Sequence, residues 1–190
     1  MKRWITILAV LAIGLLFVSG ESQQESSSMT LEEALKFNEA LKTGAKYTGP
    51  KPEGVVGTIR INKIGVELPI RYGTDDDVLD QGAGLLEGTP LPTGTKGNRT
   101  VISAHRGTPT RLFFTRLDEL EEGDTFEVDA FGQHLVYEVS EIETVLPDDT
   151  SVYESNEDLD QATLLTCTPY GINSHRLLVT GVRVPAGSDQ

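Results

Sequence analysis

The sequence has a single cysteine in 190 residues, so no disulfide can form within one chain. Basic residues are also scarce, because 16 Lys and Arg stand against 29 Asp and Glu, and the net charge is −13. This charge excludes nucleic acid and anionic lipid surfaces as favourable partners. Internal repeats and glycine-rich phosphate loops are absent. With 19 Gly and 9 Pro, the remaining composition is typical of a soluble, turn-rich protein and favours β structure.

Long apolar runs are missing except at the N-terminus. Lys2 and Arg3 precede the uncharged residues 4–18, which is the plan of a secretory signal or a short membrane anchor. Cleavage at the small residues that follow would release the protein, whereas a retained stretch would tether it, and the pattern favours the tether. We therefore expect residues 1–20 to be a signal or anchor that holds an extracellular domain at the cell membrane.

Residues 21–54 are expected to form a linker and one amphipathic helix. Polar Ser and Gln residues follow the apolar stretch, and Thr30 and Glu33 then form a capping box. Apolar residues at helical spacing continue to Gly44, which is typical of a helix end. Pro and Gly residues then mark the boundary of the main domain, which we place at residues 55–190.

The main domain alternates polar and apolar residues with a period of two, which predicts β-strands. Seven or eight short strands predict an all-β domain, either a closed barrel or a sandwich, and only residues 111–120 look helical. The acidic run at residues 75–77 is typical of a solvated turn; a calcium site is the alternative, although the alternating ligand spacing of a calcium loop is absent. The expected strands are residues 55–61, 64–70, 99–104, 124–130, 134–146, 162–167 and 176–184.

Two of these strands bring Cys167 and Arg176 together. An eight-residue loop joins the strand that ends at Cys167 to the strand that begins at Arg176. If the two strands pair as an antiparallel hairpin, these residues are neighbours at one mouth of the sheet. A guanidinium beside a thiol favours the thiolate or holds a developing oxyanion, which is the geometry of an acyl-transfer site.

A nucleophilic thiol also needs a proton acceptor, and the sequence offers three histidines. His175 adjoins Arg176 on a strand and therefore tends to face away from Cys167. His134 opens a strand after a tight turn and is typical of a cross-strand position. His105 lies where an apolar strand meets a loop, which is the usual place for catalytic groups, so we rank it first.

A structural explanation exists for each of these residues. A lone cysteine is often a small buried hydrophobe, a lone histidine is often structural, and an arginine at a strand start is often a surface charge. All three fall at strand ends, however, and a free thiol in an oxidising compartment is usually eliminated or used. The spacing alone supports a cysteine acyl-transfer enzyme and a non-catalytic domain about equally, and it names no substrate.

The segment TLLTC at residues 163–167 resembles the TLxTC signature of the sortases, the cysteine transpeptidases of Gram-positive cell surfaces. The longer string TCTPYGINSHRLLVTGVR at residues 166–183, with SAHRG at residues 103–107, looks most like class C, the pilin-polymerising branch. The resemblance runs from about residue 55 to residue 184.

This resemblance implies an eight-stranded sortase-type β-barrel with short helices, in which Cys167, His105 and Arg176 are catalytic. Cys167 would attack the Thr carbonyl of an LPxTG-like sorting signal, and a lysine amine of a pilin subunit would resolve the thioacyl-enzyme. In this scheme Arg176 contacts the oxyanion or the substrate backbone, His105 moves the protons, and Thr166 lines the site. The implied mechanism needs no metal and no organic cofactor.

Two features depart from class C. Residues 37–54 lack the Asp-Pro-aromatic motif of a lid, and the C-terminal residues carry no apolar helix, so we expect tethering through the N-terminus. A housekeeping sortase that anchors proteins to the peptidoglycan precursor is therefore an alternative. A non-catalytic exported β-barrel that binds sorting signals is the second alternative.

Overall fold

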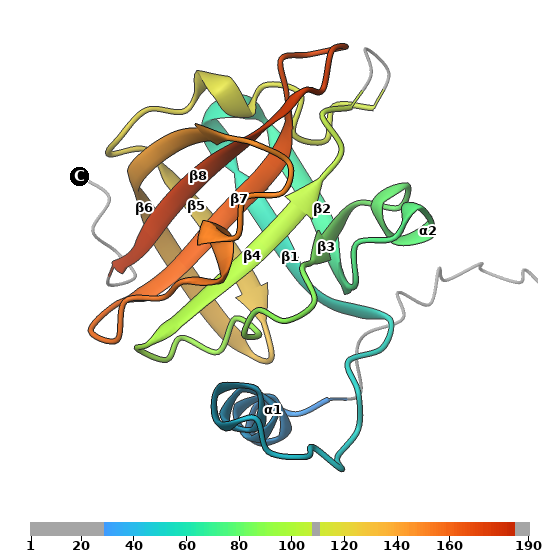
Figure 1. The fold of residues 1–190 in the computed structure, drawn as a ribbon, viewed down its shortest axis with the longest axis vertical. Helices are drawn as coiled ribbons and strands as arrows, with labels where there is room; N and C mark the ends of the chain where they lie inside the picture. Colours follow the sequence, from blue (N-terminus) through green and yellow to red (C-terminus); the bar gives the residue numbers. More distant parts are fainter. Residues whose placement is uncertain (1–28, 108–110, 185–190) are drawn as a thin grey trace, which may run out of the picture.

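A closed β-barrel forms the body of the protein (Figure 1). The computed structural model describes residues 29–107 and 111–184, and within them eight strands and one longer helix, α1 (Leu31–Thr43), confirm the predicted all-β barrel with an N-terminal helix. The other helical pieces are α2 (Asp76–Leu79), η1 (Asn62–Ile64), η2 (Leu117–Glu119) and η3 (Ser151–Tyr153). The strands are β1 (Val55–Ile61), β2 (Val66–Tyr72), β3 (Ala83–Leu85), β4 (Asn98–Ala104), β5 (Thr125–Ala130), β6 (Gln133–Val145), β7 (Asp160–Thr168) and β8 (His175–Val184).

The strand order around the barrel is β1-β2-β3-β4-β7-β8-β6-β5. Two pairs, β2 with β3 and β4 with β7, are parallel, and the other pairs are antiparallel. In the parallel pair β4 and β7, Ser103 lies opposite Leu165. Because parallel strands end at the same edge of a sheet, the loop after β4 and the last residues of β7 share one end of the barrel.

The apolar faces of the strands pack into one core inside the barrel. Burial of apolar surface contributes roughly 25 cal/mol per Å², and it is the main term that stabilises such a domain. Phe126 and Tyr137 stack in this core with ring centroids 5.4 Å apart. Gly181 faces them from β8, where a Cβ atom would come within 2.7 Å of the Phe126 ring. A side chain at this position would therefore displace the stacked rings, which explains the glycine.

Two local expectations differ from the structure. The strand β3 was not among the predicted segments, because three residues that include a glycine give no alternating pattern. The helix expected at residues 111–120 is wrong, since only the 3-10 turn η2 forms there. The buried residues Phe114, Leu117 and Leu120 are spaced by three, which is the period of a 3-10 turn and not of an α-helix. The amide of Phe114 donates to the His105 carbonyl instead of to a helical partner (3.1 Å).

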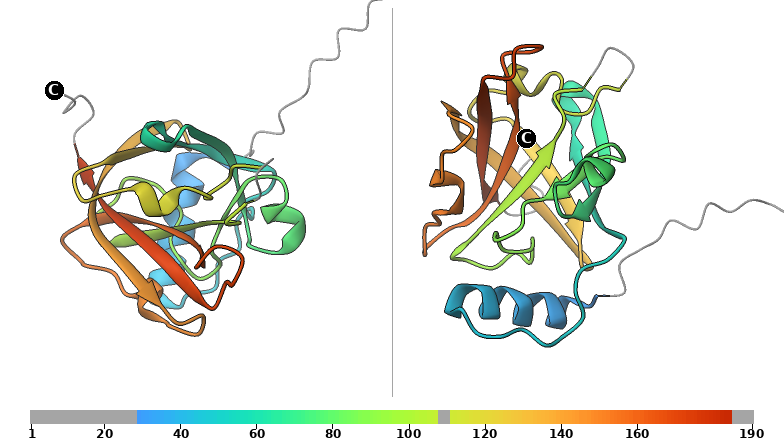
Figure 2. Two further views of the ribbon diagram at one scale, coloured as in Figure 1. Left: turned by 90° about the horizontal axis from the view of Figure 1, so that it is seen from above. Right: turned by 45° about the vertical axis from the view of Figure 1, so that its right-hand side comes forward.

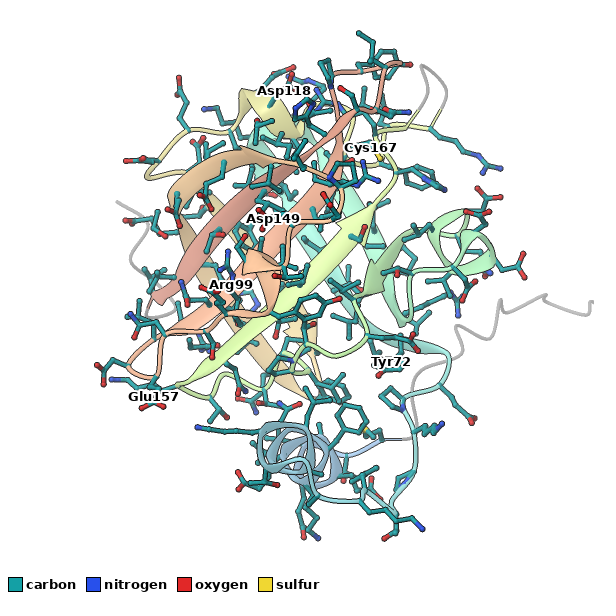
Figure 3. The ribbon with its side chains drawn as sticks, viewed as in Figure 1. Tyr72, Arg99, Asp118, Asp149, Glu157 and Cys167 are labelled. Atoms are coloured by element: carbon teal, nitrogen blue, oxygen red, sulfur yellow. The ribbon has the colours of Figure 1, made fainter. Side chains whose placement is uncertain are left out.

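The predicted capping box of α1 is present, because Thr30 Oγ1 accepts from the Glu33 amide and the Glu33 side chain accepts from the Thr30 amide. The buried Asn38 joins the helix to the barrel: its Nδ2 donates to the Leu91 carbonyl (2.9 Å) and its Oδ1 accepts from the Leu91 amide (2.8 Å). The helix lies across one end of the barrel (Figure 2, right), and Cys167 lies at the other end (Figure 3).

The expected signal or anchor at residues 1–20 lies outside the described residues. In the part of the chain that the structure describes, no helix combines the length and the apolar character needed to cross a membrane. The acidic run at residues 75–77 is explained locally, because Asp75 caps α2 by accepting a hydrogen bond from the Val78 amide (3.1 Å).

Candidate active site

Cys167 and Arg176 are direct partners across the antiparallel pair β7 and β8. This is the hairpin relationship that the strand ends predict. Both side chains are half-buried. Cys167 lies at the end of the barrel away from α1 (Figure 3), and its strand partner Arg176 lies beside it. The thiol and the guanidinium therefore reach the same space at the mouth of the barrel.

His105 reaches this space from the neighbouring strand, since it directly follows Ala104, the last residue of β4. The side chain of Thr166, the residue before Cys167, is buried, and its hydroxyl donates to the Ala104 carbonyl (2.9 Å). This bond holds the ends of β4 and β7 together, one residue before His105 and one residue before Cys167. The sequence-predicted residues are therefore brought together by strand pairing.

A cavity of about 360 Å³, here called the donor cavity, opens between these side chains. Its walls combine the predicted site residues with apolar side chains from β6, β7 and β8 and from the segment between β6 and β7. An apolar wall with a few polar groups at one end is typical of a site that holds a peptide and reacts at one bond. The lining residues include Leu86, His105, Val145, Leu146, Val152, Leu165, Thr166, Cys167, Arg176 and Leu178.

The Arg176 guanidinium is held in place by its own loop. Its Nη1 atom donates to the carbonyl oxygens of Asn173 (3.3 Å) and His175 (3.0 Å). Among the described residues no hydrogen bond engages its Nε or Nη2 atom, so both remain available to a carbonyl oxygen in the donor cavity.

The other two histidines lie elsewhere. His134 pairs through Nδ1 with Asp129 Oδ1 (2.7 Å) and lines a larger cavity of about 640 Å³ beside the start of α1. None of the predicted site residues lines that cavity. His175 contacts Ser174 Oγ through Nδ1 (2.8 Å) and does not line the donor cavity. Of the three histidines, only His105 shares a cavity with Cys167.

The chain after His105 is fixed by charged contacts. Arg106 is buried, and its Nη2 atom lies 2.7 Å from Asp118 Oδ2, which ties the end of β4 to η2. Gly107 follows with φ +83°, and a Cβ there would lie 2.3 Å from the Arg111 carbonyl. Only glycine fits this reversal of the chain, so the SAHRG string has a local structural reason.

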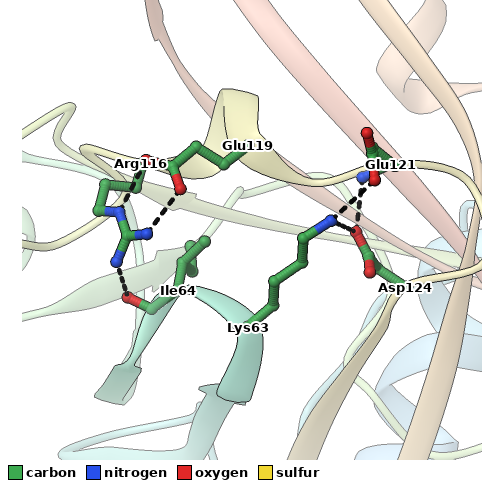
Figure 4. A network of polar contacts seen from close by, with 6 residues as sticks. All are labelled: Lys63, Ile64, Arg116, Glu119, Glu121 and Asp124. Carbon is green, nitrogen blue, oxygen red and sulfur yellow. Dashed lines mark hydrogen bonds and ion pairs between the residues drawn. The ribbon is translucent and has the colours of Figure 1, made fainter.

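A polar network fixes the far side of the same segment (Figure 4). Lys63 Nζ contacts Asp124 Oδ2 (2.7 Å) and Glu121 Oε2 (3.0 Å). Arg116 contacts Glu119 through two nitrogens (2.6 and 2.7 Å) and also donates to the Ile64 carbonyl (3.4 Å), and dashed lines mark these contacts in Figure 4. The segment that follows His105 is thus attached to η1 through Arg116. Near His105 the same segment is held by the contact between Arg106 and Asp118.

The arrangement suits acyl transfer. A thiol supplies a nucleophile, an imidazole supplies a proton donor and acceptor, and a guanidinium faces the place where an oxyanion would form. Across residues 29–107 and 111–184, no group of three or more His, Cys, Asp or Glu side chains is arranged to hold a metal ion.

Comparison with known proteins identifies the family. The model of the sortase domain matches residues 59–184. The chain belongs to the sortase family. As a sortase it is a cysteine transpeptidase, and the predicted resemblance to this family is confirmed.

Individual relatives agree with this assignment. Sortase D of Bacillus subtilis is 33% identical over 138 residues, which cover 71% of this chain and 67% of that protein. The solved structure of Clostridium perfringens sortase C with the C-terminal cell wall sorting motif is 40% identical, with a TM-score of 0.75, and the match covers 82% of this chain and 87% of that one. Sortase C of Streptococcus pneumoniae is also 40% identical, with a TM-score of 0.72 and coverage of 82% and 86%. These neighbours support the predicted similarity to class C.

One residue beside the site, Asp80, could not be identified from the sequence pattern. Asp80 Oδ1 lies 3.6 Å from His105 Nε2, although the two are far apart in the chain. Asp80 directly follows α2, in an acidic stretch that is typical of a solvated turn. Its position depends on how α2 folds over β3, which no local pattern shows.

Proposed function

We propose that this sortase polymerises pilin subunits. Its donor substrate is an LPxTG-like sorting signal, and its acceptor is a lysine amine of a neighbouring subunit. The main observation in support of this proposal is that Cys167, His105 and Arg176 line one cavity with an apolar wall. The barrel that holds them is similar to those of sortase C structures. The roles of these three residues are part of the proposal.

In the first step the Cys167 thiolate attacks the Thr carbonyl carbon of the sorting signal. The carbonyl oxygen becomes an oxyanion and accepts hydrogen bonds from the Arg176 guanidinium. The intermediate then collapses, and the C–N bond breaks as the His105 imidazolium gives its proton to the leaving glycine nitrogen. The products are a thioester on Cys167 and a neutral His105.

In the second step an amine attacks the thioester. The amine gives a proton to His105, an amide bond forms, and the Cys167 thiolate leaves. His105 and Cys167 are thereby restored to their starting protonation states. The apolar wall of the donor cavity, which includes Leu86, Val145 and Leu178, fits the Leu-Pro part of the sorting signal. Thr166 supports this wall through its bond to Ala104.

We further propose that residues 1–20 tether the enzyme to the cell membrane, with the barrel outside the cell. Sortases act at the surface of Gram-positive bacteria, and the basic residues Lys2 and Arg3 before an apolar stretch fit this location. In the described residues α1 lies at the far end of the barrel and lines neither the donor cavity nor the space around His105. It therefore does not take the place of a lid.

A housekeeping sortase that transfers proteins to a peptidoglycan precursor is the second candidate. The curated relatives that match the chain are named sortase D and sortase A, not sortase C, so class C is not the sole branch of the family to which the chain is similar. The two candidates share the first step and differ in the acceptor.

The test incubates the full-length chain and its Cys167→Ala variant with an LPxTG-type peptide and follows both by mass spectrometry. We expect a thioacyl adduct on the wild type only, and a lysine-linked product when a lysine-bearing pilin segment is added. Transfer only to a peptidoglycan-like amine would replace the pilin acceptor with the housekeeping one. The absence of any adduct under reducing conditions would leave a non-catalytic binding module.

A further inference from the structure

A second cavity meets the donor cavity at the reacting groups. It has a volume of about 360 Å³ and shares only His105 and Cys167 with the donor cavity. We call it the acceptor cavity. Its lining residues are Asp80, His105, Arg106, Gly107, Arg111, Phe113, Cys167, Tyr170, Gly171 and Asn173.

A transpeptidase must bring two substrates to one sulfur atom. When the sorting signal fills the donor cavity, its acyl carbon is bound to Cys167 and its chain lies on the Arg176 side. The acceptor cavity then gives the other approach to the thioester and to His105. Two cavities that meet only at the nucleophile and the proton carrier match this requirement.

The acceptor cavity continues into a third cavity of about 370 Å³. The two share Asp80, Arg111 and Phe113, and the third cavity adds Leu68 and Leu112, among others. The path from Cys167 therefore extends along the barrel surface past apolar side chains. Such a groove has room for a stretch of peptide on both sides of the residue that reacts.

Asp80 is the anionic group of the acceptor cavity. Its Oδ1 lies 3.6 Å from His105 Nε2 and 3.8 Å from Arg111 Nη1, and both distances exceed a hydrogen bond. Among the described residues, no hydrogen bond to this carboxylate forms. An amine that passes a proton to this histidine nitrogen lies within about 3 Å of it, and is therefore a neighbour of Asp80.

We propose that the acceptor cavity binds a peptide that presents a side-chain ammonium, and that Asp80 selects this cation. The inference rests on the proposed function and names the group that recognises its second substrate. Asp80 pairs with the ammonium of the incoming lysine while Phe113 and Tyr170 contact its aliphatic stem.

Protons and bonds balance in this scheme. The bound ammonium loses one proton to solvent and becomes a neutral amine. The amine nitrogen then attacks the thioester carbon, and its second proton passes to His105 as the amide forms and the Cys167 thiolate leaves. The glycine amine released in the first step takes up one proton from solvent, so the overall exchange of one peptide for another consumes none.

Asp80 acts on the transition state and not only on the bound ammonium. The attacking nitrogen gains positive charge while the C–N bond forms, and a carboxylate beside it lowers the energy of that state. Arg111 is the cation already beside Asp80: its Nη1 atom donates to the Asp80 backbone carbonyl (3.4 Å) and lies 3.8 Å from Oδ1, and both side chains are largely exposed, 59% for Arg111 and 65% for Asp80. The carboxylate itself accepts no hydrogen bond among the described residues, so it can still pair with an ammonium on its His105 side.

The experiment compares two nucleophiles on the same thioacyl-enzyme, using the full-length chain and a fixed LPxTG-type donor peptide. One nucleophile is a lysine-bearing peptide, and the other is hydroxylamine, which is uncharged at neutral pH. The measured quantity is the ratio of kcat/KM for the lysine peptide to kcat/KM for hydroxylamine. We expect Asp80→Asn to lower this ratio about tenfold or more, Asp80→Glu to retain most of it, and Asp76→Asn to leave it unchanged. Asp76 is the matched control because it lies on α2 and lines none of the three cavities.

The ratio separates this inference from its alternatives. If Asp80→Asn slows both nucleophiles equally, Asp80 acts through His105 and the proposed charge selection is wrong. An unchanged rate with both nucleophiles also overturns it. If the wild type forms no thioacyl adduct at all, the proposed function itself fails. If the thioacyl adduct forms and is transferred to lysine equally well in the wild type and in Asp80→Asn, the proposed function stands and only the proposed role of Asp80 is wrong.

Discussion

The Thr166 hydroxyl donates a hydrogen bond of 2.9 Å to the backbone carbonyl oxygen of Ala104. These residues immediately precede Cys167 and His105, so one buried side chain connects the strands that carry the proposed nucleophile and the proposed proton carrier. The thiol and the imidazole therefore occupy one mouth of the barrel because β4 and β7 are bonded both along their length and at their ends.

Thr166→Val removes this bond and keeps the side-chain shape. The Ala104 carbonyl is left without its partner, which costs about 1–3 kcal/mol of unfolding free energy. We also expect lower kcat for thioester formation, because His105 is less well placed. Urea unfolding and single-turnover kinetics measure the two effects. Thr166→Ser keeps the hydroxyl and is the control; a Val variant with full kcat would remove the positioning role.

Arg176→Ala is expected to lower kcat about 10²- to 10³-fold, because the oxyanion loses its charged donor. Cys167→Ala is expected to abolish the thioacyl adduct. Both variants should fold, since each side chain is half-buried at the mouth of the barrel and outside its core. Mass spectrometry of the adduct and circular dichroism check these outcomes. Arg176→Lys keeps the charge without the planar fork; if its kcat equals that of the wild type, the charge alone is sufficient.

Asn38→Ala should loosen α1 from the barrel. The substitution removes buried hydrogen bonds to Leu91 and Thr93, so the unfolding free energy should fall by about 2–3 kcal/mol. Faster amide exchange in α1 would show the local effect. Glu39→Ala, at the exposed neighbouring position, is the matched control. Because α1 lies far from Cys167, thioester formation should persist; its loss would show that the helix supports the site.

The raised pKa of Asp160 leads us to expect that the stability of the fold depends on pH. Burial raises the pKa of Asp160 from 3.8 to about 6, although Arg183 and Tyr137 lie beside it. The folded state binds this proton more tightly than the unfolded state, so the contribution of Asp160 to the unfolding free energy falls as pH rises from 4 to 7. A shift of this size corresponds to about 3 kcal/mol.

The unfolding free energy of Asp160→Asn, measured relative to that of the wild type, should therefore rise by about 2 kcal/mol between pH 4 and pH 7. Urea denaturation at several pH values measures the difference between the two proteins, in which the other titrating groups cancel. Asp158→Asn, an exposed residue of the same segment, should show no such trend. A difference that stays constant with pH would mean that Asp160 ionises normally.

Much of the barrel could be predicted because most strands alternate cleanly. The strand predicted at residues 55–61 coincides with β1, and the predicted strand ends at Cys167 and Arg176 lie within one residue of the ends of β7 and β8. The pairing of Cys167 with Arg176 also follows from sequence, because a short loop between two strands favours a hairpin. These features depend on residues that are close together in the chain, so the sequence pattern predicts them.

Other features depend on contacts between distant segments. The parallel pairing of β4 with β7 brings His105 to Cys167, and nothing in either segment alone shows it. The period-three residues near Phe114 imitate a helical pattern, although their packing produces a 3-10 turn. Asp80 could not be assigned because its approach to His105 depends on the fold of α2.

The position of β8 in the barrel has a consequence for synthesis. This C-terminal strand lies between β7 and β6, so it closes the sheet, and it also carries Arg176. A nascent chain that has emerged only as far as Cys167 has its thiol but neither the guanidinium nor a closed barrel. We therefore expect the proposed nucleophile to gain its proposed oxyanion donor only after β8 has paired with β7.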